Sequence, residues 1–186
     1  MILSSWPPEK GQSLLLHACC APCSSYVLEY LRGYYNITVF FYNPNISDQA
    51  EYAKRRDEMK RLLRLDGAAP PTGFIEGDYD PTRFYHAIRG LESAPEGGER
   101  CRRCYELRLG ETARMAEAGG FDCFATTLTV SPHKNAAAIN EIGLRAAPAY
   151  LPSDFKKKGG YSRSLELSRQ YGLYRQDYCG CEYSIR

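Results

Sequence analysis

Short apolar segments alternate along the chain with longer segments whose apolar residues recur at helical spacing. Residues 14–17 and 37–42 are apolar or β-branched runs that stop at polar or turn-forming residues, as buried strands do. Between them, residues 24–34 carry apolar side chains three and four positions apart, which predicts a helix. The same pattern predicts further strands at 74–76, 124–130 and 150–151, and further helices from Asp48 to about 66 and at 81–91, 101–118, 135–145 and 161–171.

This alternation predicts an α/β fold, because strands joined by helices form a parallel sheet with helices on both faces. We expect a Rossmann-like sheet within one domain over residues 1–186, followed after its C-terminal helix by a Cys-Gly-Cys tail. Ligands bind such sheets at the carboxyl ends of the strands. Cys19, Asn43 and Ser131 each follow a predicted strand, so we expect them at one edge.

Composition favours a protein that needs no disulfide staples. Hydrophobic residues make up 44% of the 186 residues, which is enough for a substantial core. Residues 1–10 lack a basic-then-apolar leader, and no apolar run approaches the roughly 20 residues of a membrane span. We therefore expect a cytoplasmic protein without membrane association, in which thiols stay reduced.

Seven of the eight cysteines fall into three tight groups that are far apart in the chain. The first group is Cys19, Cys20 and Cys23, the second is Cys101 and Cys104, and the third is Cys179 and Cys181. Thiols that converge from separate segments bind a metal or an iron–sulfur cluster, or exchange electrons as dithiols. Cys123 stands apart beside an apolar strand, so we interpret it as a core residue.

Each cysteine group by itself leaves alternatives open. The first group follows a strand and opens a helix, where amide groups stabilise thiolates, and its Cys20 and Cys23 also fit a thioredoxin-like pair. The second group has the i, i+3 spacing of one helix face and suits zinc equally well. The third group spans one glycine. A disulfide there would be strained and easily reduced, so this group fits a redox pair as well as two metal ligands.

Basic residues are unevenly distributed along the chain. The net charge is only +2, but cations gather in three segments. These segments are 54–64, 100–108, which surrounds the second cysteine group, and the lysine run 156–158. Each segment is compatible with an ordinary solvated surface. Beside a cysteine site, they also make a polyanionic substrate conceivable.

Six segments together resemble the QueH family of epoxyqueuosine reductases. They lie at residues 14–25, 41–46, 101–108, 127–135, 154–161 and 173–181, and they include the sequences LLLHACCAPCSS, FYNPNI, CRRCYELR and DFKKKGGY. Their occurrence in this order over nearly the whole chain is specific, whereas any one Cys-x-x-Cys is not. Residues 143–149 are richer in alanine and proline than we expect for this family.

The resemblance implies a cobalamin-independent enzyme that reduces the epoxide of epoxyqueuosine to the alkene of queuosine, at the wobble position of a tRNA anticodon. It implies a [4Fe–4S] cluster with a mononuclear iron beside it. It also implies an electron donor that the sequence does not identify. The cluster ligands carried over are Cys19, Cys20, Cys101 and Cys104, with Cys23 as a ligand of the second iron or an alternative to Cys20. The third group, Cys179 and Cys181, matches the family's redox-active pair.

The resemblance further implies a sheet related to the nucleotide-binding HUP enzymes. Cysteines stand where those enzymes carry a glycine-rich loop, so we expect no ATP chemistry. Tyr178, His17 and Asp177 are hypothetical proton donors, while Tyr161, Tyr178 and Tyr183 are hypothetical stacking partners for the substrate base. Two alternatives remain from the residues alone. One is a thioredoxin-like thiol–disulfide oxidoreductase, and the other is a zinc-binding RNA module.

Overall fold

A four-stranded parallel sheet forms the centre of the molecule. The computed structural model describes residues 11–65, 67 and 71–184. The strands are β1 (Gln12–Ala18), β2 (Tyr35–Phe41), β3 (Gly73–Glu76) and β4 (Cys123–Thr126), arranged in the order β3-β2-β1-β4. All three strand pairings are parallel. The predicted α/β class is confirmed, and the strand order is that of the first four strands of the Rossmann fold.

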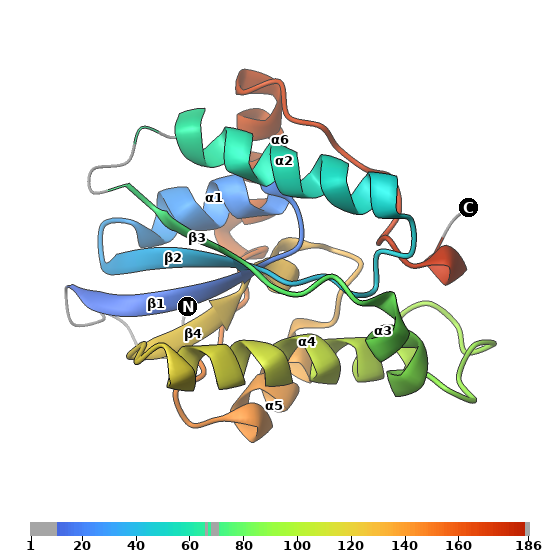
Figure 1. The fold of residues 1–186 in the computed structure, drawn as a ribbon. Coiled ribbons are helices and arrows are strands. Elements are labelled where there is room, and N and C mark those ends of the chain that lie inside the picture. The colour runs from blue at the N-terminus through green and yellow to red at the C-terminus, as the bar shows by residue number, and fades with distance from the viewer. Residues whose placement is uncertain (1–10, 66, 68–70, 185–186) are drawn as a thin grey trace.

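Helices cover both faces of this sheet (Figure 1). One face carries α1 (Ala21–Leu31), α2 (Gln49–Leu65) and α6 (Gly160–Gln170), and the other carries α3 (Pro81–Ala87), α4 (Glu99–Ala118) and α5 (Ala136–Ala146). Three short 3₁₀ helices complete the fold: η1 (Thr127–Val130), η2 (Lys157–Gly159) and η3 (Glu182–Ser184).

Alternating side chains of β1 supply both halves of the core. Leu14 and Leu16 pack into the larger apolar cluster with residues of α1, α2 and α6. Leu15 packs on the opposite face with Phe124 and with alanines of α4. Because side chains alternate across a strand, His17 lies on the Leu15 face, toward α4. Strand β1 is buried on both faces, which explains its continuous apolar sequence.

The carboxyl end of β1 lies at the point where the strand order reverses. The chain runs outward from β1 through β2 to β3, then crosses to the other side of β1 to form β4. Ligands of open α/β sheets bind at such a switch point. The first cysteine group follows β1 directly, so the topology places it where this fold class binds ligands.

Three predicted elements differ from the observed ones. The predicted strand 124–130 ends at Thr126, because its side chain accepts a hydrogen bond from the Leu128 amide and caps η1 instead. The predicted strand 150–151 is a single bridge between Tyr150 and Phe124. The predicted helix 81–91 stops at Ala87, after which the chain turns. Residues 1–10 and 66, which also carried sequence predictions, lie outside the described residues.

A close approach at the start of α6 depends on glycine. A Cβ atom on Gly160 would collide with the carbonyl oxygen of Phe155 and with the ring of Tyr26 in α1. The missing side chain lets α6 begin directly against α1, which places the following Tyr161 at the cysteine site described below. In the part of the chain that the structure describes, no helix combines the length and the apolar character needed to span a bilayer.

Candidate metal and redox site

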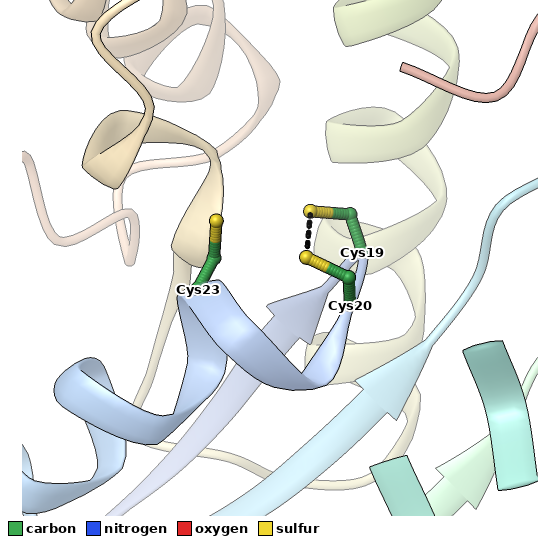
Figure 2. Close-up of side chains that lie close together, drawn as sticks. All are labelled: Cys19, Cys20 and Cys23. Carbon is green, nitrogen blue, oxygen red and sulfur yellow. Dashed lines mark hydrogen bonds between the residues drawn. The ribbon is translucent and has the colours of Figure 1, made fainter. Parts of the chain in front are cut away.

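The first cysteine group occupies the junction between β1 and α1 (Figure 2). Cys20 is the extended N-cap residue of α1, and Cys23 lies in the first turn of that helix. The sulfur atoms of Cys19, Cys20 and Cys23 all lie within 4.8 Å of one another, and those of Cys19 and Cys20 are 3.8 Å apart. One metal centre can therefore contact all three, at a helix terminus whose amides favour anionic ligands.

The three thiols differ in their pKa. Hydrogen bonds from Cys20 and Cys23 hold the pKa of Cys19 well below its usual value, and Arg108 and Lys134 act in the same direction. The hydrogen bond to Cys19 is the main cause that raises the pKa of Cys20 to about 11, and the pKa of Cys23 is raised for the same reason. Cys19 is thus the first to become a thiolate. Metal binding would release the protons that the other two retain.

The second and third cysteine groups lie together. Cys101 and Cys104 stand three residues apart near the start of α4, and Cys104 is buried in one apolar cluster with Cys181, Phe84 and Ile88. Cys101, Cys104, Cys179 and Cys181 line one small cavity of about 20 Å³. Burial raises the pKa of Cys104 to about 12. The fold therefore brings the C-terminal tail onto the cysteine pair of α4.

A larger cavity of about 260 Å³ joins this arrangement to the first group. It is lined by Cys19, Cys20 and Cys23, and it shares several lining residues with the small cavity. The shared residues are Glu96, His133, Lys134, Cys179 and Ser184. All three groups consequently belong to one continuous site, in which Cys179 borders both cavities.

The tail that carries Cys179 is held by the first turns of α2. Arg55 is buried, pairs with Glu51 at 2.6 Å and donates to the carbonyl oxygens of Cys179 at 3.0 Å and Tyr178 at 3.4 Å. Gly180 has a φ of +123°, and a Cβ there would press against Ile46 and Arg55. Glycine between the two cysteines thus allows the positive φ and leaves room for Ile46 and Arg55.

The basic segments play different parts from one another. In the first, Arg55 anchors the tail, while Arg56, Lys60 and Arg61 pair with acidic neighbours. In the second, Arg100 and Arg108 are buried, while the half-buried Arg102 and the exposed Arg103 pair with glutamates. The third segment lies at the site, since Lys156 Nζ donates to the carbonyl oxygen of Lys134 at 3.4 Å. The sequence did not predict that Arg55 anchors the tail, because its partners Tyr178 and Cys179 are far away in the sequence and no local motif marks the contact.

The hypothetical proton donors and stacking residues lie in three different places. Tyr161, Asp177 and Tyr178 line the larger cavity. Tyr183 instead packs beside the second and third cysteine groups, with Arg100 over its ring at 4.8 Å. His17 is fully buried and lines neither cavity, and burial followed by Arg108 lowers its pKa to about 3. The hypothesis that His17 supplies a proton to the substrate is therefore corrected.

The donor set suits an iron–sulfur centre. Thiolates are the ligands of such clusters, and a cluster spreads its ligands farther apart than a single ion does. The three groups surround a continuous space, and Arg108 and Lys134 bring positive charge to it. Neither cation forms an ion pair with a carboxylate among the described residues. A negatively charged centre would supply the missing counter-charge.

Comparison with known proteins agrees with these features. The family model described as "Epoxyqueuosine reductase QueH" matches residues 14–186. A protein of that name from Streptococcus pyogenes serotype M1 is 47% identical, with 97% of this chain and 74% of that protein covered. Its counterpart in Staphylococcus epidermidis is 41% identical over 98% and 81%. The one in Thermotoga maritima is 34% identical over 93% and 90%.

Proposed function

Because the chain belongs to the QueH family of epoxyqueuosine reductases, which are oxidoreductases of tRNA modification, we propose that it reduces epoxyqueuosine to queuosine at the wobble position of a tRNA anticodon. The observation that carries the proposal is the convergence of three cysteine groups on two adjoining cavities, which share Cys179 and Lys134 among their lining residues. The reaction consumes two electrons and two protons, and the epoxide oxygen leaves as water. The electrons come from a one-electron donor outside this chain.

We propose that Cys19, Cys20, Cys101 and Cys104 hold a [4Fe–4S] cluster, with Cys23 toward a mononuclear iron beside it. When bound, the irons would supply single electrons and a Lewis acid for the epoxide oxygen. The close sulfurs of Cys19, Cys20 and Cys23 support their part of this assignment. Cys179 borders both cavities and is close to Cys181, which supports a redox-active role for this pair.

The larger cavity is the proposed site of the substrate nucleoside. Proteins read single-stranded bases by turning them out and stacking them on aromatic rings, and Tyr161 and Tyr178 line this cavity. A tyrosine hydroxyl carries its proton at neutral pH, and burial raises the pKa of Tyr178 further. Tyr178 and Asp177 are therefore the proposed sources of the protons.

Metal content and turnover test the proposal together. The full chain would be purified under strictly anaerobic conditions and assayed for iron and acid-labile sulfide. It would then be incubated with a chemical one-electron reductant and tRNA that carries epoxyqueuosine. More than four irons, about four sulfides per chain and formation of queuosine are expected. Stoichiometric zinc without turnover would favour the RNA module, and a metal-free protein that reduces disulfides would favour the thioredoxin-like alternative.

The lysine run 156–158 is the proposed contact for anticodon-loop phosphates. Lys156 and Lys157 pair with Asp154, whereas Lys158 is exposed and forms no ion pair within the described residues. Lys158→Ala should weaken tRNA binding a few-fold, and should reduce the slope of log affinity against log salt by about 0.7, the contribution of one phosphate contact on a single strand. Fluorescence anisotropy with labelled tRNA at several salt concentrations measures both quantities.

A matched control is Lys60→Ala, since Lys60 of α2 pairs with Glu76 of β3 and lines neither cavity. It should leave the salt slope unchanged. Equal slopes for Lys158→Ala and the unaltered protein would remove Lys158 from the tRNA interface.

A further inference from the structure

Three residues from separate sequence segments meet in one buried network. His17 precedes the first cysteine group, Asn43 follows β2, and Arg108 lies in α4 four residues after Cys104. Arg108 Nη2 donates to Asn43 Oδ1 at 2.6 Å, and its Nε donates to His17 Nε2 at 3.3 Å. All three side chains are buried. The site as described so far gives no reason for a histidine and an asparagine at these positions.

The network fixes the direction of the guanidinium group. His17 Nε2, which faces Arg108, also lies 3.1 Å from the carbonyl oxygen of Tyr42, and His17 Nδ1 lies 2.8 Å from Thr126 Oγ1. Contacts at both ring nitrogens therefore fix the imidazole beside the guanidinium. Asn43 is held in turn, because its Nδ2 donates to the carbonyl oxygen of Ala18 at 2.9 Å. Strands β1 and β2 thus form a rigid support for the side chain of Arg108.

The positive charge of Arg108 lacks a carboxylate partner among the described residues. Moving an unpaired charge from water into the protein interior costs several kcal/mol of free energy, even after the surroundings relax. Buried cations are therefore normally paired. The buried Arg55 follows that rule, with Glu51 at 2.6 Å. Arg108 instead lines the larger cavity together with Cys19 and Cys179, and it lies one helical turn after Cys104 in α4. These cysteines come from all three cysteine groups.

We propose that Arg108 is a positioning residue that places a fixed positive charge against the iron–sulfur centre and raises its reduction potential, with His17 and Asn43 holding it there. The inference rests on the proposed function only in requiring that centre. One-electron reduction adds one electron from the external donor and no proton. Added negative charge is stabilised by a nearby buried cation, and net charge and hydrogen bonding are known controls of cluster potentials.

Two substitutions remove the free charge in different ways. Arg108→Gln deletes it. Asn43→Asp keeps the guanidinium but gives it a carboxylate partner of nearly the same shape at the 2.6 Å contact. Arg108→Lys keeps a positive charge, and Arg114→Gln removes an exposed arginine of the same helix, which pairs with Glu111, as a control. The reduction potential of the anaerobically reconstituted protein would be measured by spectroscopic redox titration, with iron and sulfide assayed in each sample.

Arg108→Gln and Asn43→Asp should each lower the potential, changing the ratio of reduced to oxidised centre at least tenfold at fixed potential, or about 59 mV for a one-electron couple. Arg108→Lys should lie nearer the unaltered protein, and Arg114→Gln should match it. Full iron content with an unchanged potential in Asn43→Asp would overturn the inference, even if Arg108→Gln failed to fold. An unaltered protein without iron would overturn the proposed centre and this inference with it.

Discussion

Cys104→Ala is expected to yield protein that holds no iron–sulfur centre and forms no queuosine. Cys104 is buried beside Cys181 and borders the small cavity, so its replacement by alanine removes a thiol from the proposed ligand set and leaves a gap in a packed cluster. A [4Fe–4S] cluster that loses one of its four thiolate ligands is open to solvent and to loss of iron. Iron and sulfide per chain, followed by the turnover assay, measure the effect.

The matched control is Cys123→Ala. Cys123 lies at the start of β4, where its Sγ is 3.8 Å from the carbonyl oxygen of Ser13, and it borders neither cavity. It should keep its iron, its sulfide and its turnover. Circular dichroism would establish that both variants are folded. A full cluster in Cys104→Ala would remove Cys104 from the ligand set and require another fourth ligand.

Cys181→Ser is expected to keep the iron but lose turnover. The hydroxyl preserves the size of the side chain and its contact with Ser184 Oγ, 3.5 Å away in the native protein, but it cannot form a disulfide with Cys179. If the third group passes electrons to the site as a dithiol that becomes a disulfide, with two electrons and two protons released together, turnover stops in this variant while cluster assembly is spared. The readouts are iron and sulfide content, the absorption spectrum of the cluster, and queuosine formation.

Cys123→Ser is the matched control for this substitution and should be fully active. Cys179→Ser is the informative companion, since Cys179 borders both cavities. Loss of turnover in both third-group variants, with iron retained, is the signature of a redox pair. Loss of iron from Cys181→Ser would instead make Cys181 a metal ligand, and full turnover would exclude either role.

The two expected results separate two functions of the cysteines that sequence spacing cannot separate. Spacing alone made the pair in α4 equally suitable for zinc and left the third group open between ligands and a dithiol. The structure adds that Cys101 and Cys104 lie against the third group, while Cys19, Cys20 and Cys23 form their own close set across the larger cavity. The proposed centre would therefore bridge two sets of thiols, with Cys179 beside both cavities.

The sequence by itself determined the secondary structure in outline. Apolar runs such as 14–17 became β1, and the helical period of residues 101–118 became most of α4. These predictions are local, because the period of apolar residues records which face of an element is buried. The motifs also determined the family. The predicted strand 124–130 was wrong beyond Thr126, because the side chain of Thr126 accepts a hydrogen bond from the Leu128 amide. This bond ends β4 and starts η1.

Only the tertiary structure decided how the site is assembled. The second and third cysteine groups lie on one cavity although they are about 80 residues apart in the sequence. The network of His17, Asn43 and Arg108 likewise connects the ends of two strands to a helix. Arg55 and Arg108 were both counted as surface charge in the sequence, yet both are buried, one paired with Glu51 and one facing the cysteines. The physical reason is that apolar residues recur with the period of their helix or strand, whereas the position of a charged residue in the sequence follows no such period. Whether an arginine meets water, a carboxylate or a thiolate depends on segments that packing brings together.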